Sequence, residues 1–143
     1  MKLYKKLCLL VPIFSLAGCG DLANFYDDMV NPNFIEVAGV RFDYSGLTDN
    51  SQEARSAALS YYDSYFVFGI DNTFTFFSSI SNAGGTYYQQ RRKVFLSVLY
   101  SDGELLPEEE RVEKTLYVYD YDLHLPLEIN NLSFSVIYTA QIL

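Results

Sequence analysis

Apolar and polar residues alternate along much of the chain after residue 33, which is typical of β-strands with one buried face. The alternation is clearest over residues 132–143, where it predicts an inward row of apolar side chains: Phe134, Val136, Tyr138, Ala140 and Ile142. Five further segments, residues 34–44, 61–70, 73–80, 86–100 and 115–125, also resemble strands. The pattern predicts an all-β domain, either an antiparallel sandwich or a small closed barrel of about six strands with one to three short peripheral helices.

Turn-forming residues separate these segments. Residues 71–72 fit a two-residue hairpin, and the two glycines within residues 82–85 make the strongest turn signal in the chain. The strand over residues 86–100 is unusually long, so we expect a bulge at residues 91–93. Pro126 is expected to end the preceding strand or to confine it to a sheet edge, because proline cannot donate a hydrogen bond to a neighbouring strand.

Two short helices are expected between strands. Asn50 and Glu53 occupy capping-box positions before an alanine-rich stretch, which predicts a helix of about two turns. Pro107 suits the start of a second helix, with Glu108–Glu110 in its first turn and Lys114 in its last. These charges complement the helix dipole, and the three glutamates are expected to form a solvated face.

The start of the chain has a different pattern. Three lysines precede the apolar residues 7–16, and Leu16-Ala17-Gly18-Cys19 closes the segment. An apolar run of about ten residues fits a secretory signal and is shorter than the ~20 residues that span a bilayer as a helix. The segment resembles the lipobox signal peptide of bacterial lipoproteins. The resemblance implies cleavage between Gly18 and Cys19 and fatty acylation of Cys19.

This resemblance also implies a location and a division of the chain. Residues 1–18 would be the signal peptide, residues 19–33 a lipidated tether with one short helix, and residues 34–143 a single β domain. The protein would then be held in the bacterial cell envelope by the membrane-inserted lipid on Cys19. Gly20 follows the cysteine directly, and this favours the outer membrane, facing the periplasm.

Charge and cysteine content narrow the functional classes. Three of the 10 basic residues lie in the signal segment, while all 18 acidic residues lie beyond it. Such an acidic domain repels phosphate groups, so we expect no nucleic-acid partner. Cys8 and Cys19 are the two cysteines, and neither lies within the β domain. We therefore expect no disulfide and no thiolate metal site there.

The chain offers little that resembles catalytic chemistry. His124, the one histidine, alternates with Asp120 and Asp122, but the outer two residues of that row would lie about 13 Å apart on a strand. One cation cannot bridge them, so we expect a polar strand face and no metal. No Gly-x-Ser-x-Gly elbow or phosphate-binding loop is present, and we expect neither enzymatic activity nor a cofactor. The basic residues 91–93 are expected to guard an exposed strand edge.

Aromatic residues are the most distinctive feature of the β domain. The chain has 13 tyrosines and 11 phenylalanines, more than one small core buries with every hydroxyl bonded. Tyr117, Tyr119 and Tyr121 are expected on the strand face opposite His124, where they form a possible binding surface. We therefore predict a non-enzymatic, lipid-anchored envelope protein that binds a protein partner or aids envelope assembly. The alternative is a small barrel that carries an apolar ligand or lipid.

Overall fold

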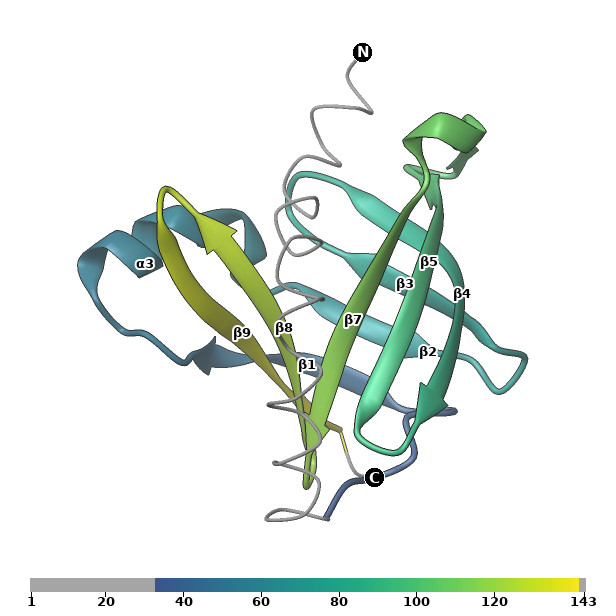
Figure 1. Cartoon of the computed structure of the whole chain (residues 1–143), viewed down its shortest axis with the longest axis horizontal. Helices are drawn as coiled ribbons and strands as arrows, with labels where there is room; N and C mark the ends of the chain where they lie inside the picture. Colours follow the sequence, from purple (N-terminus) through teal and green to yellow (C-terminus); the bar gives the residue numbers. More distant parts are fainter. Residues whose placement is uncertain (1–32, 142–143) are drawn as a thin grey trace.

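Residues 33–141, which the computed structural model describes, form a closed antiparallel β-barrel of eight strands with one extra strand. The barrel strands follow one another around the wall in chain order, and the last pairs with the first (Figure 1). They are β1 (Arg41–Leu47), β2 (Tyr65–Phe68), β3 (Thr73–Phe77), β4 (Asn82–Gln90), β5 (Lys93–Ser101), β7 (Val112–Tyr119), β8 (Asp122–Ile129) and β9 (Leu132–Ala140). The extra strand, β6 (Glu104–Leu105), pairs with β5. The all-β prediction is confirmed, in its barrel form.

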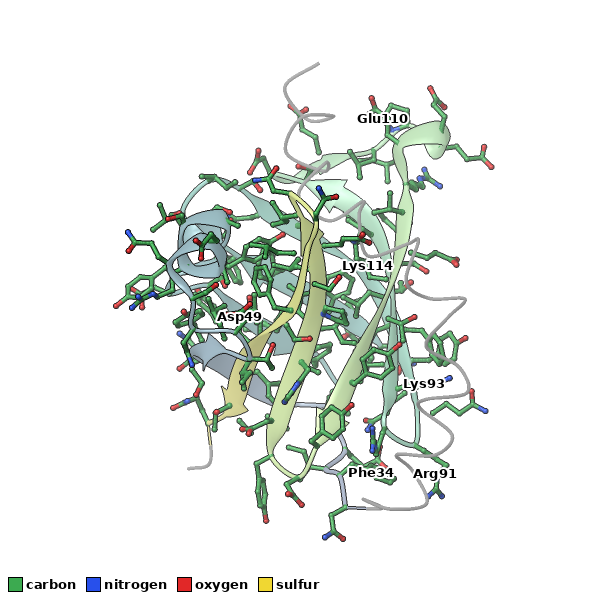
Figure 2. All side chains as sticks on the ribbon, turned by 60° about the vertical axis from the view of Figure 1, so that its left-hand side comes forward. Phe34, Asp49, Arg91, Lys93, Glu110 and Lys114 are labelled. Atoms are coloured by element: carbon green, nitrogen blue, oxygen red, sulfur yellow. The ribbon has the colours of Figure 1, made fainter. Side chains whose placement is uncertain are left out.

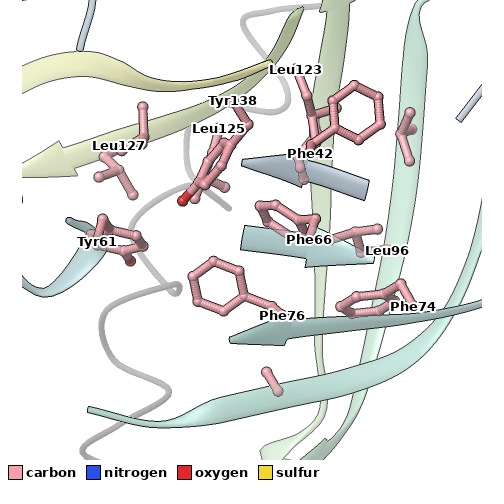
Figure 3. Close-up of a cluster of buried hydrophobic side chains, with 14 of the residues drawn as sticks. Phe42, Tyr61, Phe66, Phe74, Phe76, Leu96, Leu123, Leu125, Leu127 and Tyr138 are labelled. Carbon is pink, nitrogen blue, oxygen red and sulfur yellow. The ribbon is translucent and has the colours of Figure 1, made fainter. Parts of the chain in front are cut away.

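Side chains from every barrel strand fill the interior. Phe74 and Phe76 of β3 face inward. The alternate residues of β9 from Phe134 to Ala140 face inward as predicted, and Ile142 lies outside the described residues. The ring of Phe66 lies 4.7 Å from that of Phe76 and 5.0 Å from that of Tyr138, measured between centroids (Figure 3). An eight-stranded barrel is just wide enough to be filled in this way or to hold one small ligand.

The buried Tyr138 has a hydrogen-bond partner for its hydroxyl group inside this core. The Tyr138 hydroxyl lies 2.7 Å from Ser64 Oγ, which in turn donates to the Tyr61 carbonyl at 2.5 Å. Burial raises the pKa of both Tyr61 and Tyr138 above the usual tyrosine value. The Tyr138 hydroxyl is thus a hydrogen-bonding group of the core, and part of the aromatic surplus is structural.

Two segments predicted as single strands are hairpins. Residues 86–100 contain no simple bulge at Arg91; the chain reverses there, and β4 and β5 pair on either side of a two-residue turn. Residues 115–125 likewise reverse at Asp120, between β7 and β8. Arg91 and Asp120 adopt φ values of 56° and 53°, in the left-handed region that non-glycine residues seldom occupy. Neither turn has the glycine that marks such a reversal in a sequence.

The glycine-rich residues 82–85 lie within a strand and do not form the predicted turn. They belong to β4, and the chain reverses just before them, where the Ser78 amide donates to the Ser81 carbonyl at 3.1 Å. A Cβ atom on Gly85 would lie 1.9 Å from the Ser97 carbonyl oxygen of β5. Gly85 is therefore required for close approach of two strands at an irregularity in their register.

The helical predictions are confirmed in part. Helix α3 (Gln52–Ala57) lies where the capping pattern placed it, although its N-cap is Ser51, whose side chain accepts from the Ala54 amide. A 3₁₀ turn, η2 (Leu59–Tyr61), follows α3 and leads to β2. After Pro107 the chain forms a single 3₁₀ turn, η3 (Glu108–Glu110), so the longer helix predicted there is wrong.

Candidate functional site

Lys114 is the most unusual side chain of the barrel interior. The sequence placed it in the last turn of a surface helix, but it lies in β7, where it alternates in phase with the buried Leu116 and Val118. Its register partner on β5 is Leu96, which is also buried. Lys114 is 3% exposed, and Nζ has no hydrogen-bond partner. A buried amine with no partner is rare in proteins, because desolvation is not repaid.

Burial also changes the protonation of this amine. Loss of solvent lowers the pKa of Lys114 from its ordinary value of 10.5 to about 7. Near neutral pH the group is therefore divided between a charged ammonium and a neutral amine. The buried polar or charged residues among those described are Ser64, Arg92, Ser101 and Lys114, and none of them is acidic. The barrel supplies Lys114 with no buried carboxylate as a counter-charge.

The wall beside Lys114 is incompletely bonded. Within the described chain, β7 and β8 pair at three positions, from Tyr119↔Asp122 to Tyr117↔His124, whereas β8 and β9 pair at eight. Beyond Tyr117 the two strands diverge (Figure 1). We call this stretch, Val112 to Leu116 of β7 with Leu125 to Ile129 of β8, the β7–β8 seam. Figure 2 shows Lys114 between the ribbons of the two strands.

Pro126 explains where the pairing ends. In a hairpin closed by a two-residue turn, the flanking pair is hydrogen-bonded and every second pair after it is too. After Tyr119↔Asp122 and Tyr117↔His124, the next bonded pair of this ladder would be Thr115 with Pro126. Proline has no N–H to donate, so the ladder stops there. The prediction that Pro126 ends its strand or confines it to a sheet edge is wrong. Strand β8 continues through Pro126 to Ile129 between β7 and β9, and Pro126 pairs with Ser135 of β9.

The sequence pattern does not identify Lys114 as a buried residue, for a specific reason. The proline and glutamates before it match a helix N-terminus, so the pattern places the lysine at the end of a helix. The sequence does contain the opposing signal, because Lys114 falls at the spacing of two from Leu116 and Val118. A charged residue in the buried phase of a strand is the pattern that would have identified it.

The predicted tyrosine surface is divided by the turn at Asp120. Tyr117 and Tyr119 are half-buried on the outside of β7, and Tyr117 is the register partner of His124. The prediction that these tyrosines lie on the face opposite His124 is wrong, because the hairpin places Tyr117, Tyr119 and His124 together on the outer face of the barrel. Tyr121 is exposed within the turn. Partner binding by these three residues stays a prediction.

The aspartates near His124 do not assemble a metal site. Asp120 lies in the turn, and the Asp122 carboxylate accepts from the Thr139 hydroxyl at 2.9 Å. The His124 ring lies 4.6 Å from the ring of Tyr119, and burial lowers the pKa of the histidine. Within residues 33–141, His, Cys, Asp and Glu side chains nowhere gather in threes as a metal site requires.

The basic residues 91–93 do not guard a sheet edge, because β4 and β5 pair with each other on both sides of their turn. Arg91 is exposed in that turn, whereas Arg92 is buried. The guanidinium carbon of Arg92 lies 4.1 Å from the centroid of the Tyr119 ring, a cation–π contact. The three side chains thus do not form one basic patch.

A second surface feature lies on the outside of the barrel. Gly84 and Gly85 leave a shallow depression of about 280 Å³, bordered by Tyr100. Tyr100 is partly exposed and pairs with the exposed Leu105 of β6. Exposed aromatic and aliphatic side chains beside an apolar depression are a common feature of protein-binding surfaces.

The predicted signal peptide (residues 1–18) and all but the last residue of the predicted tether (residues 19–33) lie outside the described part of the chain. Within that part, no helix has the length and apolar character needed to cross a membrane. Comparison of the chain with protein-family models, curated proteins and solved structures gives no match.

Proposed function

We propose that this chain is a lipid-anchored protein of the bacterial cell envelope whose β-barrel binds a small apolar or amphipathic ligand. The observation that carries the proposal is the β7–β8 seam, where a barrel of ligand-binding size lacks ladder hydrogen bonds along one side. Strands joined by few hydrogen bonds separate at low cost, so the seam offers a route between solvent and the interior.

The side chains that face the interior at the seam suit hydrocarbon. Leu116 of β7 and Leu125 and Leu127 of β8 are fully buried. An alkyl chain that reaches the interior between the strands would contact these leucines, and Lys114 is the one polar side chain among the inward-facing positions of the seam. Transfer of each CH₂ group from water to such a surface contributes about 0.8 kcal/mol. Retention of a lipid acyl chain therefore has an adequate driving force.

Native mass spectrometry tests this proposal on the full chain purified from its own membranes in a mild non-ionic detergent. We expect a complex that exceeds the protein mass by one lipid-sized molecule and loses that mass on denaturation. The covalent lipid at Cys19 remains after denaturation, which separates anchor from ligand. Ligand binding would be refuted if denaturation releases no mass and the protein takes up no added fatty acid or phospholipid.

The anchor is tested separately by Cys19→Ala. We expect this variant to lose metabolic labelling by fatty acid and to keep its signal segment uncleaved. A chain that remains labelled after the change would contradict the lipobox interpretation. Because the test reports on residue 19 alone, its result is independent of what the barrel binds.

Binding of an envelope protein is the second candidate function, and the depression over Gly84 and Gly85 favours it. Tyr100 and Leu105 supply adjacent exposed apolar side chains there. Crosslinking in intact cells followed by mass spectrometry tests this function, with Tyr100→Ser as the variant and Tyr88→Ser, exposed elsewhere on β4, as its control. One dominant partner that is lost only in the Tyr100 variant supports the function, and an unchanged set of crosslinks contradicts it.

A further inference from the structure

We propose that the Lys114 amine binds the anionic group of an amphipathic ligand, a carboxylate or phosphate attached to hydrocarbon, held at the β7–β8 seam. This inference rests on the proposed ligand-binding function and names the chemical class of the ligand. It is carried by three observations that coincide at one place: a buried cation, the lack of a partner for its Nζ atom, and the wall that lacks ladder hydrogen bonds beside it.

The missing counter-charge is the first argument. The chain has 18 acidic residues, yet none of those described bonds to Lys114. A single glutamate at an inward position of β5 or β8 would pair the amine, but these strands place Leu96, Leu125 and Leu127 there instead. Since a buried charge is stable only when paired, the anion comes from outside residues 33–141, and we assign it to the ligand.

The second argument is the environment of the amine. An ion pair formed away from water is stronger than one at the surface, and an ammonium–carboxylate hydrogen bond adds to the attraction. A nearby anion also favours the charged form of Lys114, whose pKa burial has lowered to about 7. The ligand thus supplies the charge that stabilises the protonated amine, and the leucines beside it take the hydrocarbon.

The third argument is discrimination among lipids. A fatty alcohol of equal length makes the same hydrocarbon contacts but brings no charge to Nζ. Loss of a charged hydrogen bond in a buried site corresponds to about 10- to 100-fold in affinity. Acid and alcohol of one chain length therefore separate the role of Lys114 from that of the leucines.

The experiment uses the full chain in non-ionic detergent and a photoactivatable C16 fatty acid, with hexadecanoic acid, hexadecanol and phosphatidic acid as competitors. The variants are Lys114→Met, which keeps the side-chain volume and removes the charge, and Lys93→Met, the same change at a half-buried position on the outside of β5. Removing an unpaired buried charge does not endanger folding, so binding by the Lys114 variant can be measured.

For the unmodified protein and the Lys93 variant, we expect hexadecanoic acid to compete at least about tenfold better than hexadecanol. In the Lys114 variant the acid should lose this advantage, while the alcohol competes as before. Stronger competition by phosphatidic acid would identify a phospholipid as the source of the anion, and stronger competition by hexadecanoic acid a free fatty acid. Equal competition by acid and alcohol in all three proteins would overturn the role of Lys114 and leave ligand binding intact. Failure of every competitor and probe would overturn the proposed function itself.

Discussion

Replacement of Lys114 by methionine should stabilise the barrel, and the gain should depend on pH. In the folded protein the pKa of Lys114 is about 7, whereas the ordinary value is 10.5. Between these two pH values the unfolded chain holds a proton that the folded chain has released, so stability increases as pH rises. Below pH 7 both states are charged, and the folded state bears the full cost of the buried ammonium.

The size of the effect follows from the shift in pKa. At 1.36 kcal/mol per pKa unit, the change from 10.5 to about 7 corresponds to roughly 5 kcal/mol. About 4 kcal/mol of that cost disappears as the pH is raised from about 7 to about 10, because the unfolded lysine then also begins to lose its proton. The methionine variant pays no such cost, so its advantage over the unmodified protein should shrink by about 4 kcal/mol across this range.

Urea unfolding of protein freed of non-covalently bound lipid, followed by far-UV circular dichroism at intervals of pH from about 7 to 10, measures this difference. The control is Lys93→Met, which removes the other lysine of the β domain from the outer side of the barrel and should show no comparable pH-dependent gain. A Lys114 variant that is less stable than the unmodified protein, or whose advantage is the same at every pH, would refute the argument. It would mean that the amine is paired or solvated in the folded state.

Three further predictions concern the barrel wall and core. Gly85→Ala should destabilise the protein by about 1–3 kcal/mol or more, because the new Cβ would clash with the Ser97 carbonyl oxygen. The control is Gly46→Ala, where nothing lies within 4 Å of the new Cβ, and this variant should change the free energy of unfolding little. Pro126→Ala restores a backbone N–H at the seam, and hydrogen exchange should show that this amide is protected by a hydrogen bond to β7. An amide that exchanges freely would contradict our explanation of where the β7–β8 pairing ends. Burial raises the pKa of Tyr138, so the folded state keeps a proton that the unfolded chain releases near pH 10, and stability should fall as the pH rises further. Tyrosinate absorbance should show a buried class that ionises only on unfolding, and ionisation of every tyrosine in the folded state would exclude this.

The sequence identifies the class of fold because buried and exposed residues alternate without interruption along most strands. Phe74 and Phe76, and the row from Phe134 to Ala140, are buried as their alternation requires. The capping pattern after Asn50 also identifies a helix, because the signal is local: a polar side chain bonds the first amides of the helix, and the alanines that follow favour helical backbone.

The strand count could not be obtained in the same way. The turns at Arg91 and Asp120 use residues that favour no particular reversal, and pairing between the flanking strands holds these residues at positive φ. At Gly84 and Gly85 the sequence predicts a turn where none exists, because here the lack of a side chain allows two strands to approach closely. Both errors arise because tertiary pairing overrides a local signal.

The candidate site depends on the same distinction. Lys114 is recognisable only when β7 is known to begin at Val112, and the glutamates before that residue favour a helix instead. Its isolation inside the barrel depends on which side chains the neighbouring strands place beside it, and no local pattern contains that information.

Closure of the barrel by β1 and β9 makes the two ends of the domain depend on each other. Strand β1 (Arg41–Leu47), near the start of the domain sequence, pairs with β9 near its end, and Phe42 lies opposite Ala140. A chain that stopped before Leu132 would leave both β1 and β8 with bare backbone along one side. Such rims readily recruit strands from other molecules, so truncated products of this protein should aggregate instead of forming a smaller stable domain.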